Sequence, residues 1–211
     1  SGTLSPTQGT KIAVDLEPGE KLVGVAITDG TRDVMLASSE GKAVRFYEDD
    51  VRAMGRNAAG VRGIRLPEGE DVISLIIPDP DGLILTASEN GFGKLTPVED
   101  FPLHGRGGQG VIAMQTSERN GRLVAATQVS TSDELMLMSS SGTLVRARAG
   151  EISVLGRNTQ GVRLIRLDDG ERLVGVEPVE PENGEPGEGD GEAVDGAAAD
   201  AGSPAEPPNP V

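Results

Sequence analysis

Cysteine and tryptophan are absent from the 211 residues, and aromatic residues make up only 2% of the chain. The absence of cysteine excludes disulfides, thiolate metal sites and thiol nucleophiles, and it is typical of a reducing compartment. With so few rings, the core must consist of Val, Ile, Leu, Met and Ala, and a platform that stacks the bases of single-stranded nucleic acid is disfavoured. These absences favour a cytoplasmic protein with an aliphatic core.

Long apolar runs are also missing. No stretch of 18 apolar residues could span a bilayer, and residues 1–6 lack the basic and apolar regions of a signal peptide. We therefore expect no membrane association. The first residue is Ser1 rather than Met, so we expect the chain to be a fragment of a longer protein.

Positive charge is absent from the C-terminal region. From Glu177 onward there are ten acidic residues, no Lys or Arg, and seven of the 14 prolines. Such a segment cannot bury enough apolar surface to offset its chain entropy, so we predict a disordered acidic tail at 179–211. Most of the net charge of −15 lies there, because residues 1–176 hold 24 acidic against 19 basic residues.

The body, residues 1–178, repeats itself every fifty or so residues. Two loop glycines, a turn glycine and the apolar start of a strand each recur 50 or 51 residues apart. These landmarks are Gly55, Gly105 and Gly156; Gly60, Gly110 and Gly161; Gly41, Gly91 and Gly142; and Leu22, Val72, Leu123 and Leu173. We predict repeats near 22–66, 72–116 and 123–167, preceded by part of another unit.

Within the first unit, apolar and β-branched runs predict strands at 22–27, 34–37, 42–47 and 61–66, separated by turn residues. The middle two form a hairpin, and the second copy has Asn90-Gly91 at its turn, which favours type I′. Four short strands at this period predict an all-β, β-propeller-like array of four-stranded blades in an incomplete ring. The alternative is an ordinary β-sandwich with accidental internal similarity.

Each unit contains a loop that reads Gly-Arg, three variable residues, then Gly-Val. Its glycines free the backbone to turn and expose N–H groups, and its arginine suits a phosphate diester. Other arginines follow these loops or alternate along strands, as a discontinuous basic stripe on an outer rim would require. The candidate nucleic-acid-binding residues are Arg45, Arg56, Arg62, Arg65, Arg106, Arg146, Arg148, Arg157, Arg163 and Arg166. The alternatives are plain connecting turns and a solvated strand face.

Catalytic groups are not evident in the sequence. His104 is the only histidine and lies beside a loop glycine, while Tyr47 has no activating group near it in the sequence. Residues 79–82 lack the twelve-residue pattern of a calcium loop, and no glycine loop ends in the Gly-Lys-Ser/Thr of a nucleotide-binding loop. We expect no catalytic residue, metal or cofactor in this fragment.

Residues 51–56 (VRAMGR), 60–66 (GVRGIRL) and 156–162 (GRNTQGV) resemble the C-terminal domain of the A subunit of bacterial DNA gyrase, and the resemblance covers residues 1 to about 178. It implies the last blades of a six-bladed β-pinwheel whose rim binds and bends duplex DNA, so that the holoenzyme introduces negative supercoils with ATP. It also implies partners in the gyrase B subunit, in the rest of the A subunit, a nucleoid-associated location, and an acidic tail that regulates wrapping.

The same resemblance places the DNA-cleaving tyrosine, ATP and Mg elsewhere in the holoenzyme. The family's basic box, Gln-Arg-Arg-Gly-Gly-Lys-Gly, has only a degenerate counterpart at 105–110, with Gln109 in place of its lysine. That departure argues against independent wrapping by this fragment. Two alternatives stay open: a propeller scaffold that binds protein partners, and the C-terminal domain of the A subunit of topoisomerase IV.

Overall fold

The computed structural model describes residues 14, 16–55 and 58–179. They fall within one compact unit, Ser1–Pro181. Arg56 and almost all of the predicted acidic tail lie outside the described residues.

The described residues form eleven β-strands and three short 3-10 helices, with no α-helix among them. The strands are β1 (Asp33–Ser38), β2 (Lys42–Tyr47), β3 (Val72–Ile76), β4 (Leu83–Ser88), β5 (Phe92–Pro97), β6 (Val111–Ile112), β7 (Leu123–Val129), β8 (Glu134–Ser139), β9 (Leu144–Arg148), β10 (Val162–Arg163) and β11 (Leu173–Val179). A 3-10 helix follows each hairpin: η1 (Glu48–Asp50), η2 (Val98–Asp100) and η3 (Ala149–Glu151). The predicted all-β class is confirmed.

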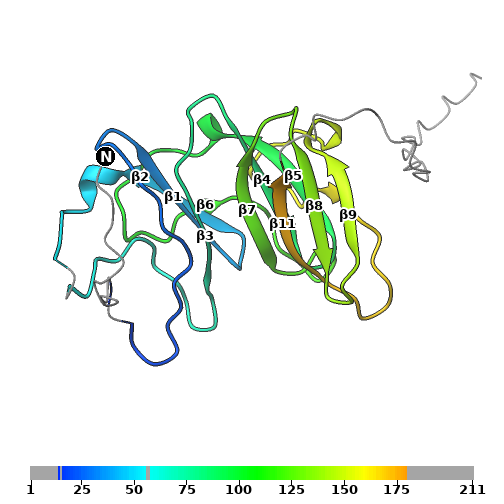
Figure 1. Cartoon of the computed structure of the whole chain (residues 1–211), viewed down its shortest axis with the longest axis horizontal. Helices are drawn as coiled ribbons and strands as arrows, with labels where there is room; N and C mark the ends of the chain where they lie inside the picture. Colours follow the sequence, from blue (N-terminus) through cyan, green and yellow to red (C-terminus); the bar gives the residue numbers. More distant parts are fainter. Residues whose placement is uncertain (1–13, 15, 56–57, 180–211) are drawn as a thin grey trace, which may run out of the picture. The chain divides into compact units, whose positions relative to one another are not determined.

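Three antiparallel sheets are built from these strands (Figure 1). Blade A has the order β3-β1-β2-β6, blade B has β10-β5-β4-β7, and blade C has the three strands β11-β8-β9. The equivalent strands β3, β7 and β11 contact one another in sequence, so they form the inner edges of the blades. The two-residue strands β6 and β10 lie at the opposite, outer edges of blades A and B.

Each blade draws its strands from two repeats. Blade A, for example, takes its hairpin β1–β2 from the first unit, while β3 and β6 both come from the second. The prediction that each unit supplies its own four strands is therefore wrong. The predicted strands at 22–27 and 61–66 are also wrong, because equivalent segments pair with the hairpin of the preceding unit and the described chain has no earlier hairpin.

The aliphatic core lies within the blades and at the joints between them. One cluster joins Leu85 and Leu95 of blade B to Leu135 and Leu137 of blade C, all almost completely buried. Another joins blade A to blade B. Burial of this apolar area, at about 25 cal/mol per Å², fixes the blades against each other and gives the loops at their outer edges a rigid support.

Candidate nucleic-acid interface

The glycine-rich loops lead directly into the outer-edge strands. Gly110 and Gly161, the last residues before β6 and β10, have positive φ angles of 72° and 76°. A Cβ atom there would lie 2.4 Å from the carbonyl oxygen of Ala43 and 2.6 Å from that of Gly93, respectively. Glycine is therefore required at the point where each loop enters the neighbouring blade.

The loop at 105–110 packs along the segment that follows the first loop. Arg106 donates from Nη1 to the carbonyl oxygen of Arg62 (3.2 Å) and from Nε to that of Asp50 (2.7 Å). The backbone N–H of Arg65 donates to the carbonyl oxygen of Gly108 (2.8 Å). These contacts bring Arg62, Arg65 and Arg106, all exposed, into one group, which we call the first rim group.

The loop at 156–161 repeats this geometry one unit further on. Arg157 donates from Nη1 to the carbonyl oxygen of Ile112 (2.8 Å), and the N–H of Gln115 donates to the carbonyl oxygen of Thr159 (2.9 Å). Arg106 and Arg157 thus each anchor their own loop through part of the guanidinium group. The turn interpretation and the binding interpretation of these loops are therefore compatible.

A second rim group consists of Arg157, which is half-buried, and the exposed Arg163 and Arg166. The unit between the two groups carries Ile112 and Gln115 at the positions occupied elsewhere by arginine. The basic side chains of the two rim groups are therefore discontinuous along the rim.

Sequence reasoning missed one arginine beside the second rim group. The guanidinium groups of Arg119 and Arg163 stack on the ring of the buried Phe92, with Cζ 4.7 and 5.2 Å from its centroid. Such contacts hold a cation over a ring while leaving its N–H edge free to donate. The clue in the sequence was Phe92 directly after the turn glycine, a position with no aromatic residue in the other copies.

The arginines predicted along the strands form ion pairs with carboxylates of this chain. Arg45 pairs with Asp33 (2.7 Å) and donates from Nη1 to the carbonyl oxygens of Val98 and Phe101 (3.0 and 3.2 Å), and only 14% of its side chain is exposed. Arg146 pairs with Glu134, and Arg148, 74% exposed, lies 3.8 Å from Glu151. Arg45 therefore joins blade A to the next unit, and its geometry favours an internal role.

A buried cation supports the second rim group. Lys94, on β5, is fully buried and donates from Nζ to the carbonyl oxygen of Gly156 (2.6 Å), to that of Arg157 and to Oγ1 of Thr159 (3.0 Å). Burial, aided by repulsion from Arg157 and opposed by Asp100, lowers the pKa of Lys94 to about 8. No sequence signal pointed to it, because the equivalent residues in the other hairpins are Val44 and Val145.

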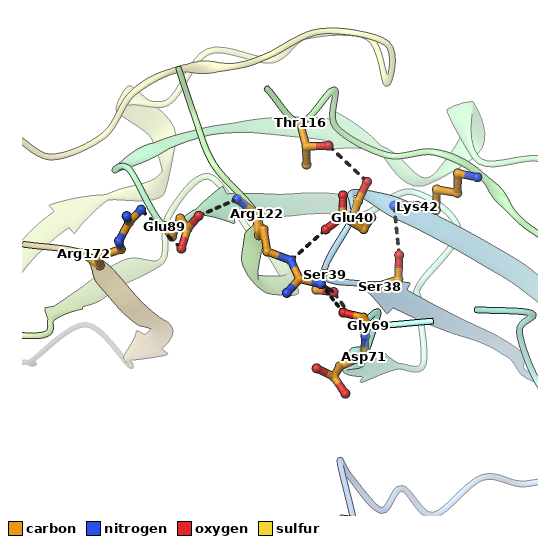
Figure 2. Close-up of polar contacts among 10 residues, drawn as sticks. All are labelled: Ser38, Ser39, Glu40, Lys42, Gly69, Asp71, Glu89, Thr116, Arg122 and Arg172. Atoms are coloured by element: carbon orange, nitrogen blue, oxygen red, sulfur yellow. Dashed lines mark hydrogen bonds and ion pairs between the residues drawn. The ribbon is translucent and has the colours of Figure 1, made fainter. Parts of the chain in front are cut away.

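Two further arginines connect the blades (Figure 2). Arg122 pairs with Glu40 (2.7 Å) in the turn of blade A and donates from Nη2 to the carbonyl oxygen of Gly69 (2.6 Å). Its counterpart one unit on, Arg172, lies 3.4 Å from Glu89 in the turn of blade B. Both arginines immediately precede an inner strand, and their engagement removes two of the basic side chains from the candidate interface.

Other kinds of site find little support in the described part of the chain. No group of three or more His, Cys, Asp or Glu side chains there is arranged to hold a metal ion. None of its helices has the length and apolar character needed to cross a membrane.

The family model described as "DNA gyrase C-terminal domain, beta-propeller" matches residues 5–29, 32–79, 82–130 and 133–180. The chain belongs to this gyrase C-terminal domain family. Each of the three longer matches begins just before a hairpin and ends just after the inner strand that follows it, so the family's repeat coincides with the hairpin and inner strand of one blade.

Relatives in this family include the DNA gyrase A subunit of Pseudomonas aeruginosa, 58% identical over 179 residues, with 85% of this chain and 19% of the relative covered. The DNA gyrase A subunit of Escherichia coli K12 is 51% identical, with 90% of the chain and 21% of the relative covered. The chain thus spans about a fifth of the length of these curated relatives.

Two solved structures support the same fold. A DNA gyrase A C-terminal domain matches with a TM-score of 0.72 and 28% identity, covering 79% of this chain and 57% of that one. A DNA topoisomerase IV C-terminal domain matches with a TM-score of 0.75 and 26% identity, covering 80% and 53%. The higher identity to the gyrase relatives makes the topoisomerase IV alternative the weaker one.

Proposed function

We propose that the chain is a DNA-binding and DNA-wrapping region of the A subunit of a DNA gyrase, and that it contacts the duplex backbone without reading its sequence. The observation that carries this proposal is the repeated packing of the Gly-Arg loops at the outer blade edges, which gathers arginines into two rim groups. Arginine is suited to this role because its planar donors match phosphate oxygens.

In this proposal the chain contributes to ATP-dependent negative supercoiling by a type IIA topoisomerase without supplying catalytic residues. Its partners are duplex DNA, the rest of the gyrase A subunit, and the gyrase B subunit, which uses ATP and Mg. The location is the bacterial cytoplasm at the nucleoid. The names of the curated relatives and the basic rim groups support this assignment.

The first test is duplex binding as a function of salt. Each phosphate neutralised contributes about −0.9 to the slope of log affinity against log salt, so the change Arg62→Ala with Arg65→Ala is expected to reduce the slope by roughly 1.8. Fluorescence anisotropy with a labelled duplex of mixed sequence measures this slope. These positions are preferable to Arg106 and Arg157, whose guanidinium groups also anchor the loops.

The exposed Lys21 lies outside both rim groups, so the control Lys21→Ala, which removes one positive charge, should leave the slope unchanged. A wild-type chain that bound duplex DNA with no dependence on salt, or not at all, would contradict the proposed function. It would favour the scaffold alternative.

The acidic tail is expected to compete with DNA for the rim. Because β11 extends to Val179, the deletion should begin at residue 180, which removes nine acidic residues and preserves the strand. A tethered polyanion acts at high local concentration and is screened by salt, so we expect tighter binding after deletion, mainly at low salt.

A control of the same length, with those nine acids changed to their amides, separates charge from steric bulk. It should bind as tightly as the deleted form. Equal affinity of the wild-type and deleted chains throughout a salt titration would disprove tail competition.

A further inference from the structure

The loop at 156–161 has an inner side that is defined by Lys94. Its ammonium group donates hydrogen bonds to the carbonyl oxygens of Gly156 and Arg157 and to the hydroxyl of Thr159, which therefore lie on one side of the turn. Two successive carbonyl groups therefore point toward the buried lysine. The direction of these two carbonyl groups also sets the direction of the N–H groups in the same peptides.

In a trans peptide the C=O and N–H groups point in opposite directions, and the described residues contain no cis bond. The N–H groups that share these two peptides belong to Arg157 and Asn158, so both point away from Lys94. Neither N–H group has an acceptor within the described part of the chain. Successive outward N–H groups form a concavity of the kind that binds anions.

The outer side of the turn is also open and basic. A Cβ atom on Gly156 would meet nothing within 4 Å, and Asn158 is exposed. The guanidinium group of Arg157 uses Nη1 for the carbonyl oxygen of Ile112 and makes no other hydrogen bond or ion pair with residues 16–55 and 58–179. Its remaining donors are therefore available to a ligand.

The loop at 105–110 shows that this arrangement is not a general property of the repeat. Val44 occupies the place of Lys94, and the N–H of Gly107, equivalent to that of Asn158, donates to the carbonyl oxygen of Gly63 (2.5 Å). One of the two outward donors is thus already used there. Of these two loops, only the one above Lys94 keeps the pair free.

Lys94 is not needed to satisfy the loop's own polar groups. The hydroxyl of Thr159 donates to the carbonyl oxygen of Gly156 (3.0 Å), and the N–H of Thr159 donates to that of Arg157 (3.0 Å). A cation buried without a carboxylate in direct contact is unfavourable unless it is compensated, and an anion on the outer side of the turn would compensate it.

We propose that the turn Gly156–Asn158 is a binding site for one phosphate oxyanion of the DNA backbone. The donors are the N–H groups of Arg157 and Asn158 and the guanidinium group of Arg157, and Lys94 is the residue that positions them. This inference rests on the proposed function, since it assigns one phosphate contact within duplex binding.

The test is a titration of the 15N-labelled chain, followed by the amide signals. Inorganic phosphate and a short duplex, each compared with chloride at equal ionic strength, are expected to shift the Arg157 and Asn158 amide signals downfield. The Arg106 and Gly107 amides, from the loop without a buried lysine, serve as the internal comparison and should shift less.

The outcomes separate the two claims. A duplex that perturbs Arg62 and Arg65 but not the Arg157 and Asn158 amides would overturn this inference and leave the proposed function intact. No perturbation anywhere would contradict the proposed function itself. A response to inorganic phosphate alone would identify a free-anion site and overturn the assignment to DNA.

The variant Lys94→Met tests the positioning role. Methionine keeps much of the side-chain length without the charge, so we expect a folded chain, duplex affinity lowered about tenfold, and a salt slope reduced by about 0.9. The change Lys21→Met removes one positive charge from an exposed site and should change neither the duplex affinity nor the salt slope. A salt slope and amide shifts that are unchanged in Lys94→Met would overturn the positioning role of Lys94. If that variant fails to fold, the titration of the wild-type chain still tests whether phosphate binds at Arg157 and Asn158.

Discussion

Replacing Arg45 with alanine is expected to lower the free energy of unfolding by about 3 kcal/mol, because it leaves Asp33 as a largely buried, unpaired carboxylate. It also removes the donors to the carbonyl oxygens of Val98 and Phe101, which tie blade A to the next unit. Urea denaturation followed by circular dichroism measures the change. Duplex affinity of the folded fraction should be unchanged.

The matched control is the equivalent pair in blade C. Arg146 and Glu134 lie on the corresponding strands of its hairpin, but their side chains are 44% and 24% exposed rather than 14% and 14%. Double-mutant cycles should therefore give a coupling of about 0.5–1 kcal/mol for this pair and a clearly larger one for Arg45 with Asp33. Equal couplings would contradict the stronger stabilising role of the Arg45–Asp33 pair. Loss of DNA binding without loss of stability in Arg45→Ala would instead place Arg45 at the interface.

The variant Gly161→Ala is expected to destabilise the chain by about 3 kcal/mol. Its Cβ atom would sit 2.6 Å from the carbonyl oxygen of Gly93 at a φ angle of 76°, so both steric crowding and backbone strain oppose it. The affected carbonyl lies on β5, where β10 pairs with blade B. Loss of this pairing should also weaken duplex binding, because Arg163 and Arg166 of the second rim group lie within and just after β10.

Two other glycines separate the causes. Gly142 has a φ angle of 89° with nothing within 4 Å of its Cβ position, so Gly142→Ala should cost about 1 kcal/mol from strain alone. Gly105 has neither strain nor crowding, so Gly105→Ala should be nearly neutral. If Gly161→Ala cost no more than Gly142→Ala, the close approach to Gly93 would be unimportant.

The hairpins and the period could be predicted from the sequence because they depend on local signals. Alternating apolar residues and the turn glycines at Gly41 and Gly91 determine β1–β2 and β4–β5 within one unit. The partners of β6 could not be predicted in the same way. A repeated pattern looks the same whether Val111 pairs with the hairpin of its own unit or with that of the unit before, and only the three-dimensional packing distinguishes the two.

Part of the candidate interface could also be predicted from local sequence signals. The Gly-Arg loops at 105–110 and 156–161 could be recognised by spacing, and they lie at the outer edges as the rim hypothesis requires. Arg45 and Arg146 could not be told apart, because their different burial depends on whether a following unit covers them. Lys94 was missed because a lysine among apolar strand residues has no pattern of its own.

The exchange of strands between units has a consequence for how such proteins change length during evolution. The hairpins of blades A and B receive their inner and outer strands from later units, and equivalent segments occur in each unit. Loss or duplication of one whole unit in the gene therefore presents each internal hairpin with a new but equivalent donor. A deletion or duplication that begins and ends at unrelated points of the repeat would separate a hairpin from its donor strands, so the number of blades is expected to change by whole units.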